Sequence, residues 1–254
     1  KVVAVVSAFG DTTDLLLEQA RAFSAEPDMS GLASLVATGE ATAASYLVLA
    51  LDKAGITAEL FDASRAGLRT QGSPLDATPI SLDTAKFEEA FQESPVIVMP
   101  GFVGRSERGA QTLLGRGGSD LTALFVADQL EAECILFKDV DGYYDRDPNT
   151  EGTEAKRFDK LSWESALTIG GGVVQEKAIY FSRVRSLEFS VRAPGQPGQT
   201  SVGAFGDVLS GNRAALSRQR VVLLGCGTVG LGVLKRLCEL PNKFEVVAIA
   251  VSDL

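Results

Sequence analysis

Short runs of apolar, β-branched residues alternate with longer segments of helical periodicity along the first three quarters of the chain. The run VVAVV at 2–6 has no polar alternation, which is typical of a strand buried on both faces of a parallel sheet. A turn at Gly10 and a helix from about Leu15 follow this strand. The same alternation predicts strands at 58–61, 96–99, 134–137 and 187–191, and helices at 41–54, 121–130 and 163–169.

This alternation predicts an α/β fold, a three-layer sandwich in which helices cover both faces of a mostly parallel central sheet. The segment 193–212 interrupts it, because its many Gly, Pro, Ser and Gln residues favour an edge or a linker over a central helix. A βαβ unit follows, with a strand at 220–224, a glycine loop at 225–230, a helix at 231–240 and a strand at 244–251. We therefore predict one domain at 1–208, and a linker with this βαβ unit at 209–254.

Composition narrows the chemistry that these elements can carry. The formal net charge of −9 argues against nucleic acid as a partner, because backbone binding needs clustered Lys and Arg. The sequence contains no His, which removes imidazole catalysis and His-ligated metals, and we expect no metal site. No run approaches the roughly 20 apolar residues of a membrane helix, and no signal peptide is evident, so a membrane partner is not expected. The cysteines lack CxxC spacing and are expected to be buried thiols in a reducing cytosol; they are Cys134, Cys226 and Cys238.

The segment LLGRGGSDLTA at 113–123 combines a glycine loop with the start of a predicted helix. Its three glycines allow a ligand to approach the backbone closely, and Arg116 can form two hydrogen bonds with a carboxylate. Ser119 and Asp120 begin a helix whose first amides face an anion. These residues predict an anion pocket, while a plain Gly-rich turn with a Ser-Asp cap is the alternative.

A second segment, FKDVDGYYDRDP at 137–148, runs from a strand into a turn with four aspartates, for which an exposed acidic turn is the simple alternative. In this order and spacing, however, GRGGSD and DVDGYYxxDP resemble the aspartokinase members of the amino acid kinase family. SAFGDTTD at 7–14 is similar to that family's loop after its second strand, and ATGE at 37–40 is similar to the start of its substrate helix. The resemblance covers about residues 1–203.

The resemblance implies a pocket for L-aspartate surrounded by Thr13, Glu40, Arg116, Ser119 and Asp120. In this pocket Arg116 would pair with a carboxylate, Glu40 would hold the amino group, and Arg116 and Asp120 would be the catalytic residues. Considered without the resemblance, Glu40 is more simply a solvated glutamate in the first turn of a helix, where the helix dipole favours it.

The resemblance also implies a nucleotide site for ATP with Mg²⁺ at the second motif. Asp139 and Tyr144 would lie near the base and ribose, and Lys138 near the phosphates. The implied reaction transfers the γ-phosphoryl group of ATP to the β-carboxylate of L-aspartate, an early step towards lysine, threonine and methionine. A carboxylate needs no general base to act as a nucleophile, which agrees with the absence of His.

Three cations of the family pattern are missing here. The chain starts downstream of the family's first strand and its Lys-Phe-Gly-Gly segment, Asn149 replaces an arginine, and Gly172 stands where a lysine is expected. Lys138, Arg146 and Lys177 are candidates to substitute in part. Because loss of one preorganised donor typically costs about 100-fold in rate, a catalytically degenerate domain that assembles or regulates a fused enzyme is a second hypothesis. A related kinase acting on glutamate or another carboxylate is a third.

The sequence GCGTVG at 225–230 fits GxGxxG between a predicted strand and helix, with Asp253 near the end of the next strand. With its flanks it resembles the start of a homoserine dehydrogenase, and fusion to an aspartokinase is a known arrangement of the family. The unit would be an incomplete Rossmann βαβ, truncated at the C-terminus, so no dehydrogenase activity is expected of this chain. The implied NAD(P)-binding residues are Gly225, Gly227, Thr228, Val229 and Gly230. No stretch resembles the family's paired regulatory domains, and the resemblance implies a cytoplasmic homodimer or higher homo-oligomer.

Overall fold

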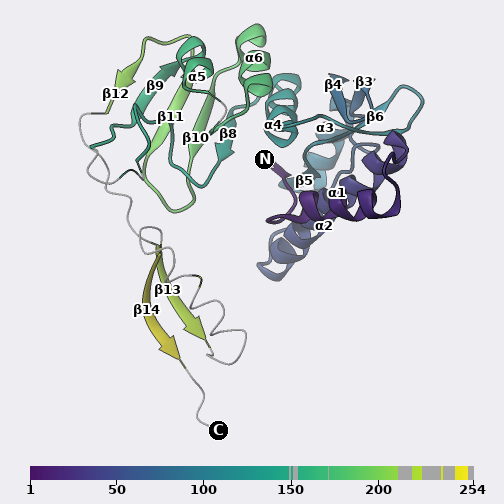
Figure 1. Ribbon diagram of the computed structural model, residues 1–254, viewed down its shortest axis with the longest axis horizontal. Coiled ribbons are helices and arrows are strands. Elements are labelled where there is room, and N and C mark those ends of the chain that lie inside the picture. Colours follow the sequence, from purple (N-terminus) through teal and green to yellow (C-terminus); the bar gives the residue numbers. More distant parts are fainter. Residues whose placement is uncertain are drawn as a thin grey trace.

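The structure, a computed structural model, describes residues 1–148, 150, 154–170, 172–210, 219–224, 236 and 244–250. Within this part, Figure 1 shows helices and sheets interleaved along the chain, with α4 (Gly118–Gln129) between the two main groups of strands. The prediction of an α/β fold with mostly parallel sheet is confirmed. Hydrogen bonding nevertheless divides the expected single central sheet into a three-stranded and a five-stranded sheet, and α4 contacts both.

The three-stranded sheet is entirely parallel, in the order β1-β5-β2. Its strands are β1 (Val2–Val6), β5 (Val96–Pro100) and β2 (Ala58–Leu60), all predicted to within a residue or so. The helices α2 (Met29–Lys53) and α3 (Thr84–Glu93) pack against it. Ile97 and Met99 of β5 join a core that includes Phe87 of α3, which fixes the sheet against its helices.

The five-stranded sheet is mixed, in the order β12-β9-β11-β10-β8. Its strands are β8 (Cys134–Phe137), β9 (Phe158–Ser162), β10 (Phe189–Arg192), β11 (Gln199–Gly203) and β12 (Val208–Leu209). The prediction of an edge or linker at 193–212 was wrong for β11, which pairs with β10 on one side and β9 on the other. Thr200 and Val202 are fully buried there, so tertiary packing outweighs the Gly- and Pro-rich composition of the segment.

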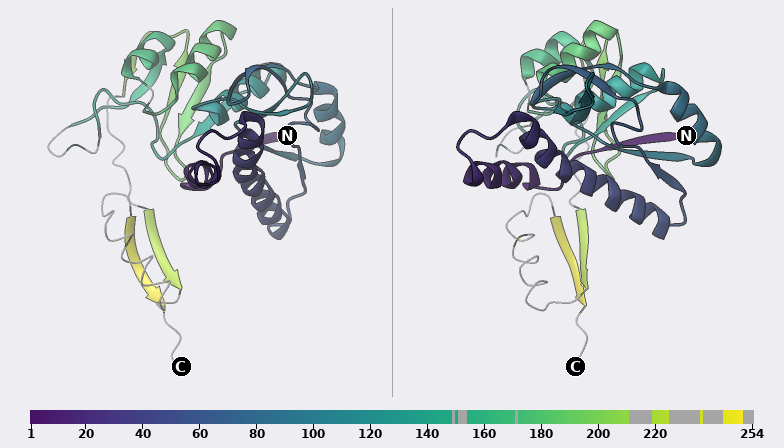
Figure 2. Two further views of the ribbon diagram at one scale, coloured as in Figure 1. Left: turned by 45° about the vertical axis from the view of Figure 1, so that its right-hand side comes forward. Right: turned by 90° about the vertical axis from the view of Figure 1, so that its right-hand side faces the viewer.

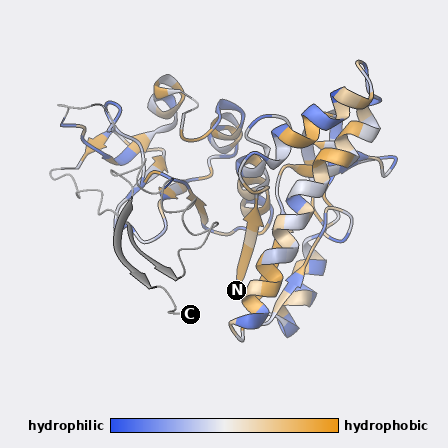
Figure 3. Ribbon diagram, turned by 60° about the horizontal axis from the view of Figure 1, so that its bottom comes forward, coloured by the Kyte–Doolittle hydropathy of each residue, from blue (hydrophilic) through white to orange (hydrophobic). Residues whose placement is uncertain are grey.

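The helices α5 (Trp163–Ile169) and α6 (Glu176–Arg185) follow β9, and α6 packs against α4. A further sheet, in the order β4-β3-β6-β7, was not predicted. Its strands are short and rich in polar residues, without a long apolar run that would predict them. They are β3 (Arg69–Ser73), β4 (Asp76–Ser81), β6 (Val103–Ser106) and β7 (Gln111–Leu113). Figure 3 colours the described residues by hydropathy.

Two N-terminal helices begin earlier than predicted. The first, α1 (Thr12–Phe23), includes part of the expected turn, and α2 begins at Met29 rather than near 41. The side chain of Asp28 accepts a hydrogen bond from the Gly31 amide at 2.7 Å, which caps α2 there. By length and composition alone α2 would be able to cross a membrane, contrary to the expectation from apolar runs. The share of its apolar window that is buried within the protein is 33%, and core helices of soluble proteins and signal sequences meet the same criterion of length and composition.

At the C-terminal end, β13 (Gln219–Leu224) and β14 (Phe244–Ala250) form a parallel pair, visible as two strands side by side in Figure 2. Both strands were predicted, and parallel pairing is what a βαβ unit requires. Asp253, Cys226 and Cys238 lie outside the described residues. So do the predicted NAD(P)-binding residues, which are Gly225, Gly227, Thr228, Val229 and Gly230. Cys134 is buried as expected, and burial raises the pKa of its thiol to about 12.

Candidate active site

The glycine loop ends in a tightly packed start of α4. Gly117 has a φ of 73°, in the left-handed region, and caps the helix. A Cβ at Gly118 would lie 2.5 Å from the ring of Phe102 and 2.9 Å from Leu114, so only glycine fits. Thr122 Oγ1 accepts from the Phe102 amide at 3.0 Å and donates to the Gly118 carbonyl at 2.8 Å. The first amides of α4 are therefore held in fixed positions, as anion binding at a helix N-terminus requires.

Asp120, in the first turn of α4, forms an ion pair with Lys138, which follows β8. Lys138 Nζ lies 2.6 Å from Oδ1 and 2.7 Å from Oδ2 of Asp120. The side chains are 14% exposed for Asp120 and 23% for Lys138. Burial raises the pKa of the Asp120 carboxyl, and the charge of Lys138 opposes that shift. The pair brings the two sequence motifs into direct contact.

Glu40 lies in the middle of α2 and is only 3% exposed, so the simple interpretation as a solvated first-turn glutamate was wrong. Its Oε1 accepts a hydrogen bond of 3.4 Å from the Ala8 amide, just after β1. Its Oε2 is buried without a partner among the described residues. Burial raises the pKa of Glu40, against the smaller effect of the Ala8 amide. A buried, half-satisfied carboxylate of this kind is suited to a cationic group of a ligand.

The ends of neighbouring strands bring these groups together. The Gly101 amide, after β5, donates to the carbonyl of Val6 in β1 at 2.7 Å. A Cβ at Gly101 would lie 2.8 Å from the Cβ of Ser119, so the start of α4 packs directly on this backbone. Glu40, through Ala8, and Lys138 lie next to the carboxyl ends of β1 and β8. Ligands of open α/β sheets bind in this position.

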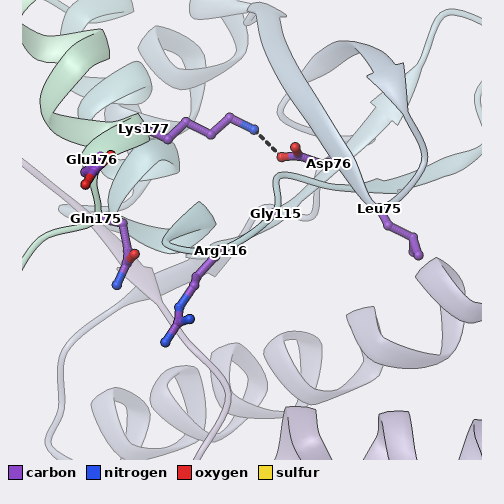
Figure 4. A pocket seen from close by; sticks show the side chains of 7 residues that line it. All are labelled: Leu75, Asp76, Gly115, Arg116, Gln175, Glu176 and Lys177. Atoms are coloured by element: carbon purple, nitrogen blue, oxygen red, sulfur yellow. Dashed lines mark hydrogen bonds and ion pairs between the residues drawn. The ribbon is translucent and has the colours of Figure 1, made fainter. Parts of the chain in front are cut away.

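A cavity of about 720 Å³ adjoins the glycine loop. Figure 4 shows Arg116 and Gln175 projecting to the same side of it. Within the part of the chain that the structure describes, Arg116 makes no hydrogen bond and no ion pair, so its guanidinium is available to a carboxylate or phosphate. The cavity is lined by Leu75, Asp76, Gly115, Arg116, Gln175, Glu176 and Lys177.

Lys177 already has three partners across this cavity. Its Nζ lies 2.6 Å from Asp76 Oδ1, 2.8 Å from the Leu114 carbonyl and 3.1 Å from that of Ala77. Lys177 therefore connects α6, β4 and the glycine loop, as Figure 4 shows for its contact with Asp76. Sequence reasoning did not identify Asp76, because a single aspartate in a polar hairpin carries no recognisable pattern.

The second motif places Lys138, Asp139 and Tyr144 in one turn after β8. Asp139 is exposed, whereas Tyr144 is buried, and its hydroxyl donates to Asp141 Oδ1 at 2.7 Å. Arg146 is 55% exposed and lies 3.3 Å from Asp145. Asn149 falls outside the described residues.

Thr13 lies in the first turn of α1 and makes no side-chain hydrogen bond within the described ranges. Its neighbour Thr12 approaches the α2 backbone instead, since a Cβ at Gly39 would lie 3.2 Å from the Thr12 methyl. Of the five residues expected around aspartate, Ser119 and Asp120 share the start of α4, Arg116 is in the adjoining loop, and Glu40 lies beside the loop after β1.

The parallel strands, the glycine loop at a helix N-terminus and the acidic turn define an α/β protein with a candidate anion site at the carboxyl edge of its sheet. The chain belongs to the amino acid kinase family, which it matches over residues 1–184. It is 35% identical to an aspartokinase of Bacillus sp. (strain MGA3) over 196 residues, which is 76% of this chain and 47% of that protein. The chain thus spans about half the length of the relatives it matches.

Solved structures show the same likeness. A crystal structure of E. coli aspartokinase III in complex with lysine and aspartate matches with a TM-score of 0.64 and 26% identity, over 80% of this chain and 58% of that chain. A structure of the same E. coli enzyme in complex with aspartate and ADP matches with a TM-score of 0.58 and 27% identity, over 77% and 45%. The fold is therefore that of aspartokinases.

Proposed function

We propose that this chain is the catalytic part of an aspartate kinase, which phosphorylates the β-carboxylate of L-aspartate with ATP. The ion pair between Asp120 and Lys138 carries this proposal. It joins the start of α4, where the substrate carboxylate is expected, to the turn after β8, where the nucleotide is expected. Similarity to aspartokinases, and to an aspartokinase structure with aspartate and ADP, supports the same assignment.

The substrate would be oriented by groups of opposite charge. The unpaired guanidinium of Arg116 and the amides at the start of α4 would bind carboxylate oxygens. The buried Glu40 would bind the ammonium group through its unpartnered Oε2. Glutamate is longer by one methylene group, so L-aspartate against L-glutamate is the comparison that tests the third hypothesis from the sequence.

The transfer itself needs no protein base. A β-carboxylate oxygen of aspartate attacks the γ-phosphorus of ATP, the bond from that phosphorus to the bridging oxygen breaks, and ADP leaves with the electron pair. The products are an acyl phosphate and ADP. Lys138 is the cation best placed to interact with the phosphates, since it lies beside the start of α4. Its present pairing with Asp120 would have to loosen or be shared as the phosphates bind.

Magnesium would accompany the nucleotide. Kinases often hold Mg²⁺ through substrate phosphates and one or two carboxylates. Among the described residues no cluster of three or more His, Cys, Asp and Glu side chains forms a cage, and both oxygens of Asp120 face Lys138. These residues do not fit a metal site formed before the nucleotide binds.

A catalytically degenerate domain is the second candidate, and one observation favours it. The cations that were expected to replace the missing ones are engaged by carboxylates: Lys138 by Asp120, Lys177 by Asp76 and Arg146 by Asp145. In this case the chain would bind aspartate or nucleotide and regulate or assemble a fused enzyme. The parallel pair β13 and β14 supports a βαβ unit as that neighbour, and the sequence resemblance implies that it would be the start of a homoserine dehydrogenase that uses NAD(P). The cytoplasmic location, homo-oligomeric state and role in lysine, threonine and methionine synthesis stay predictions.

Trapping the acyl phosphate with hydroxylamine tests the proposal. The chain is incubated with ATP, Mg²⁺ and L-aspartate, and the hydroxamate is measured for the parent, Arg116→Ala and Arg108→Ala. Arg108 is an exposed arginine in the turn between β6 and β7 that does not line the cavity, and it serves as the matched control. Hydroxamate that falls about 100-fold in Arg116→Ala but not in Arg108→Ala supports the kinase. Aspartate binding without hydroxamate from any form supports the degenerate domain.

A further inference from the structure

A buried ion pair lies behind the turn that carries the proposed nucleotide residues. Asp141 is 2% exposed in its side chain, and both of its carboxylate oxygens are used. Oδ1 accepts from the hydroxyl of Tyr144 at 2.7 Å, and Oδ2 accepts from Nη1 of Arg157 at 2.8 Å. Tyr144 is therefore oriented by Asp141, and Asp141 is oriented by Arg157.

Arg157 is itself fixed on a second side. Its Nη2 donates to Asp159 at 3.2 Å, and its side chain is 11% exposed. The planar guanidinium holds two carboxylates in a defined geometry, which a lysine ammonium does not reproduce. The backbone adds to this, because Tyr144 and Arg157 form an antiparallel bridge and the Phe158 amide donates to the Tyr143 carbonyl at 2.8 Å. Side chain and main chain thus hold the same turn.

Two glycines allow the ion pair to be covered closely. A Cβ at Gly198 would overlap Nη1 of Arg157 and Oδ2 of Asp141. Gly142 has a φ of 147°, and a Cβ there would overlap Thr200 Oγ1 and lie 3.0 Å from Cδ of Arg157. The backbone therefore covers the pair closely, and the low exposure of both side chains strengthens their electrostatic attraction.

We propose that Arg157 is a positioning residue for nucleotide binding. It acts through Asp141 and Tyr144 and fixes the conformation of the turn 139–145 before the nucleotide arrives. A turn fixed in this way loses less conformational freedom on binding than a mobile one. This inference rests on the proposed function, since it assigns to the turn the nucleotide that the kinase would use.

Substitution of Arg157 by lysine tests the role while the charge is kept. We expect Arg157→Lys to weaken ADP binding by about ten-fold in calorimetry and to raise the KM for ATP, with the KM for aspartate within two-fold of the parent. Arg185→Lys is the matched control. Arg185 also holds an aspartate, Asp128, through Nε at 3.0 and 3.1 Å, but this pair joins α6 to α4 at an exposed position. The substitution Arg185→Lys should therefore leave ADP binding unchanged.

A double variant separates positioning from the cost of a buried charge. Arg157→Met alone leaves Asp141 unpaired and is expected to unfold at a lower temperature. Adding Asp141→Asn removes that charge and should restore much of the thermal stability without restoring ADP affinity. ADP affinity within two-fold of the parent in Arg157→Lys or in the double variant overturns the positioning role alone. If the parent binds no ADP at all, the proposed function fails, and the role of Arg157 fails with it.

Discussion

Lys138 Nζ lies within 2.7 Å of both carboxylate oxygens of Asp120, although 18 positions separate the two residues in the sequence. One belongs to the turn after β8 and the other to the start of α4. Two motifs that are separately ambiguous, a glycine-rich turn and an acidic turn, are thereby in direct contact, as one shared site would require. Burial raises the pKa of the Asp120 carboxyl, and the positive charge of Lys138 opposes that rise.

Removal of Lys138 should destabilise the protein in a pH-dependent way. Lys138→Met leaves the ionised Asp120 without its cation, and we expect a loss of about 1–3 kcal/mol in the free energy of unfolding, measured in urea. The loss should shrink at acidic pH, where Asp120 is protonated, and should be largely removed in Lys138→Met/Asp120→Asn.

The matched control for this prediction is Lys86→Met. Lys86 pairs with Asp83 at 3.5 Å, and both side chains are more than 40% exposed, so its removal should cost under about 1 kcal/mol. Equal effects of the two lysine substitutions at pH 8 would contradict a special role for the Asp120 pair.

Glu40→Gln should separate stability from binding. The pKa of Glu40 is raised by burial, so between its ordinary value of 4.5 and the raised value the folded state holds more protons than the unfolded state. Stability then falls as pH rises through this window, and the variant, which lacks this titration, should be at least as stable as the parent at pH 8. Binding of L-aspartate should weaken about ten-fold or more, because glutamine offers no charge to the ammonium.

In the parent, aspartate affinity should rise with pH as Glu40 ionises, and calorimetry at several pH values measures this directly. Glu89→Gln, an exposed substitution on α3, is the control and should change neither stability nor binding. A flat pH profile for the parent, or full affinity in Glu40→Gln, would rule out Glu40 as the ammonium partner.

Gly118→Ala should displace the start of α4. The added methyl group would lie 2.5 Å from the ring of Phe102 and 2.9 Å from Leu114, and we expect a loss of about 1–3 kcal/mol in chemical denaturation together with weaker aspartate binding. Gly206→Ala is the control, since no atom lies within 4 Å of its added Cβ. If both variants unfold at the same urea concentration, the close packing at Gly118 is not as described.

The sequence predicted the positions of β1, β5 and β8 well, because these strands are short apolar runs. The expectation that β1 is buried on both faces was wrong, because β1 lies at the edge of its sheet and is only partly buried. The prediction from sequence failed where tertiary packing determines the secondary structure. The local sequence of β11 does not distinguish this strand from a linker. The small residues of α2 give no clear sign in the sequence that the helix begins at Met29. At the candidate site, the motifs singled out Arg116 and Lys138, whose roles stay predictions. The sequence did not give the partners Asp76 and Arg157, because neither belongs to a recognisable motif and both contacts form only in the folded chain.

Isotope transfer from labelled aspartate tests the kinase assignment most directly. L-Aspartate with ¹⁸O in its β-carboxylate is incubated with the chain, ATP, Mg²⁺ and hydroxylamine, and the released phosphate is analysed by ³¹P NMR. If the carboxylate attacks the γ-phosphorus, hydroxylamine expels a phosphate that retains one oxygen from aspartate, and the account predicts this labelled phosphate. Phosphate that carries no ¹⁸O, or no phosphate that depends on aspartate, would contradict it.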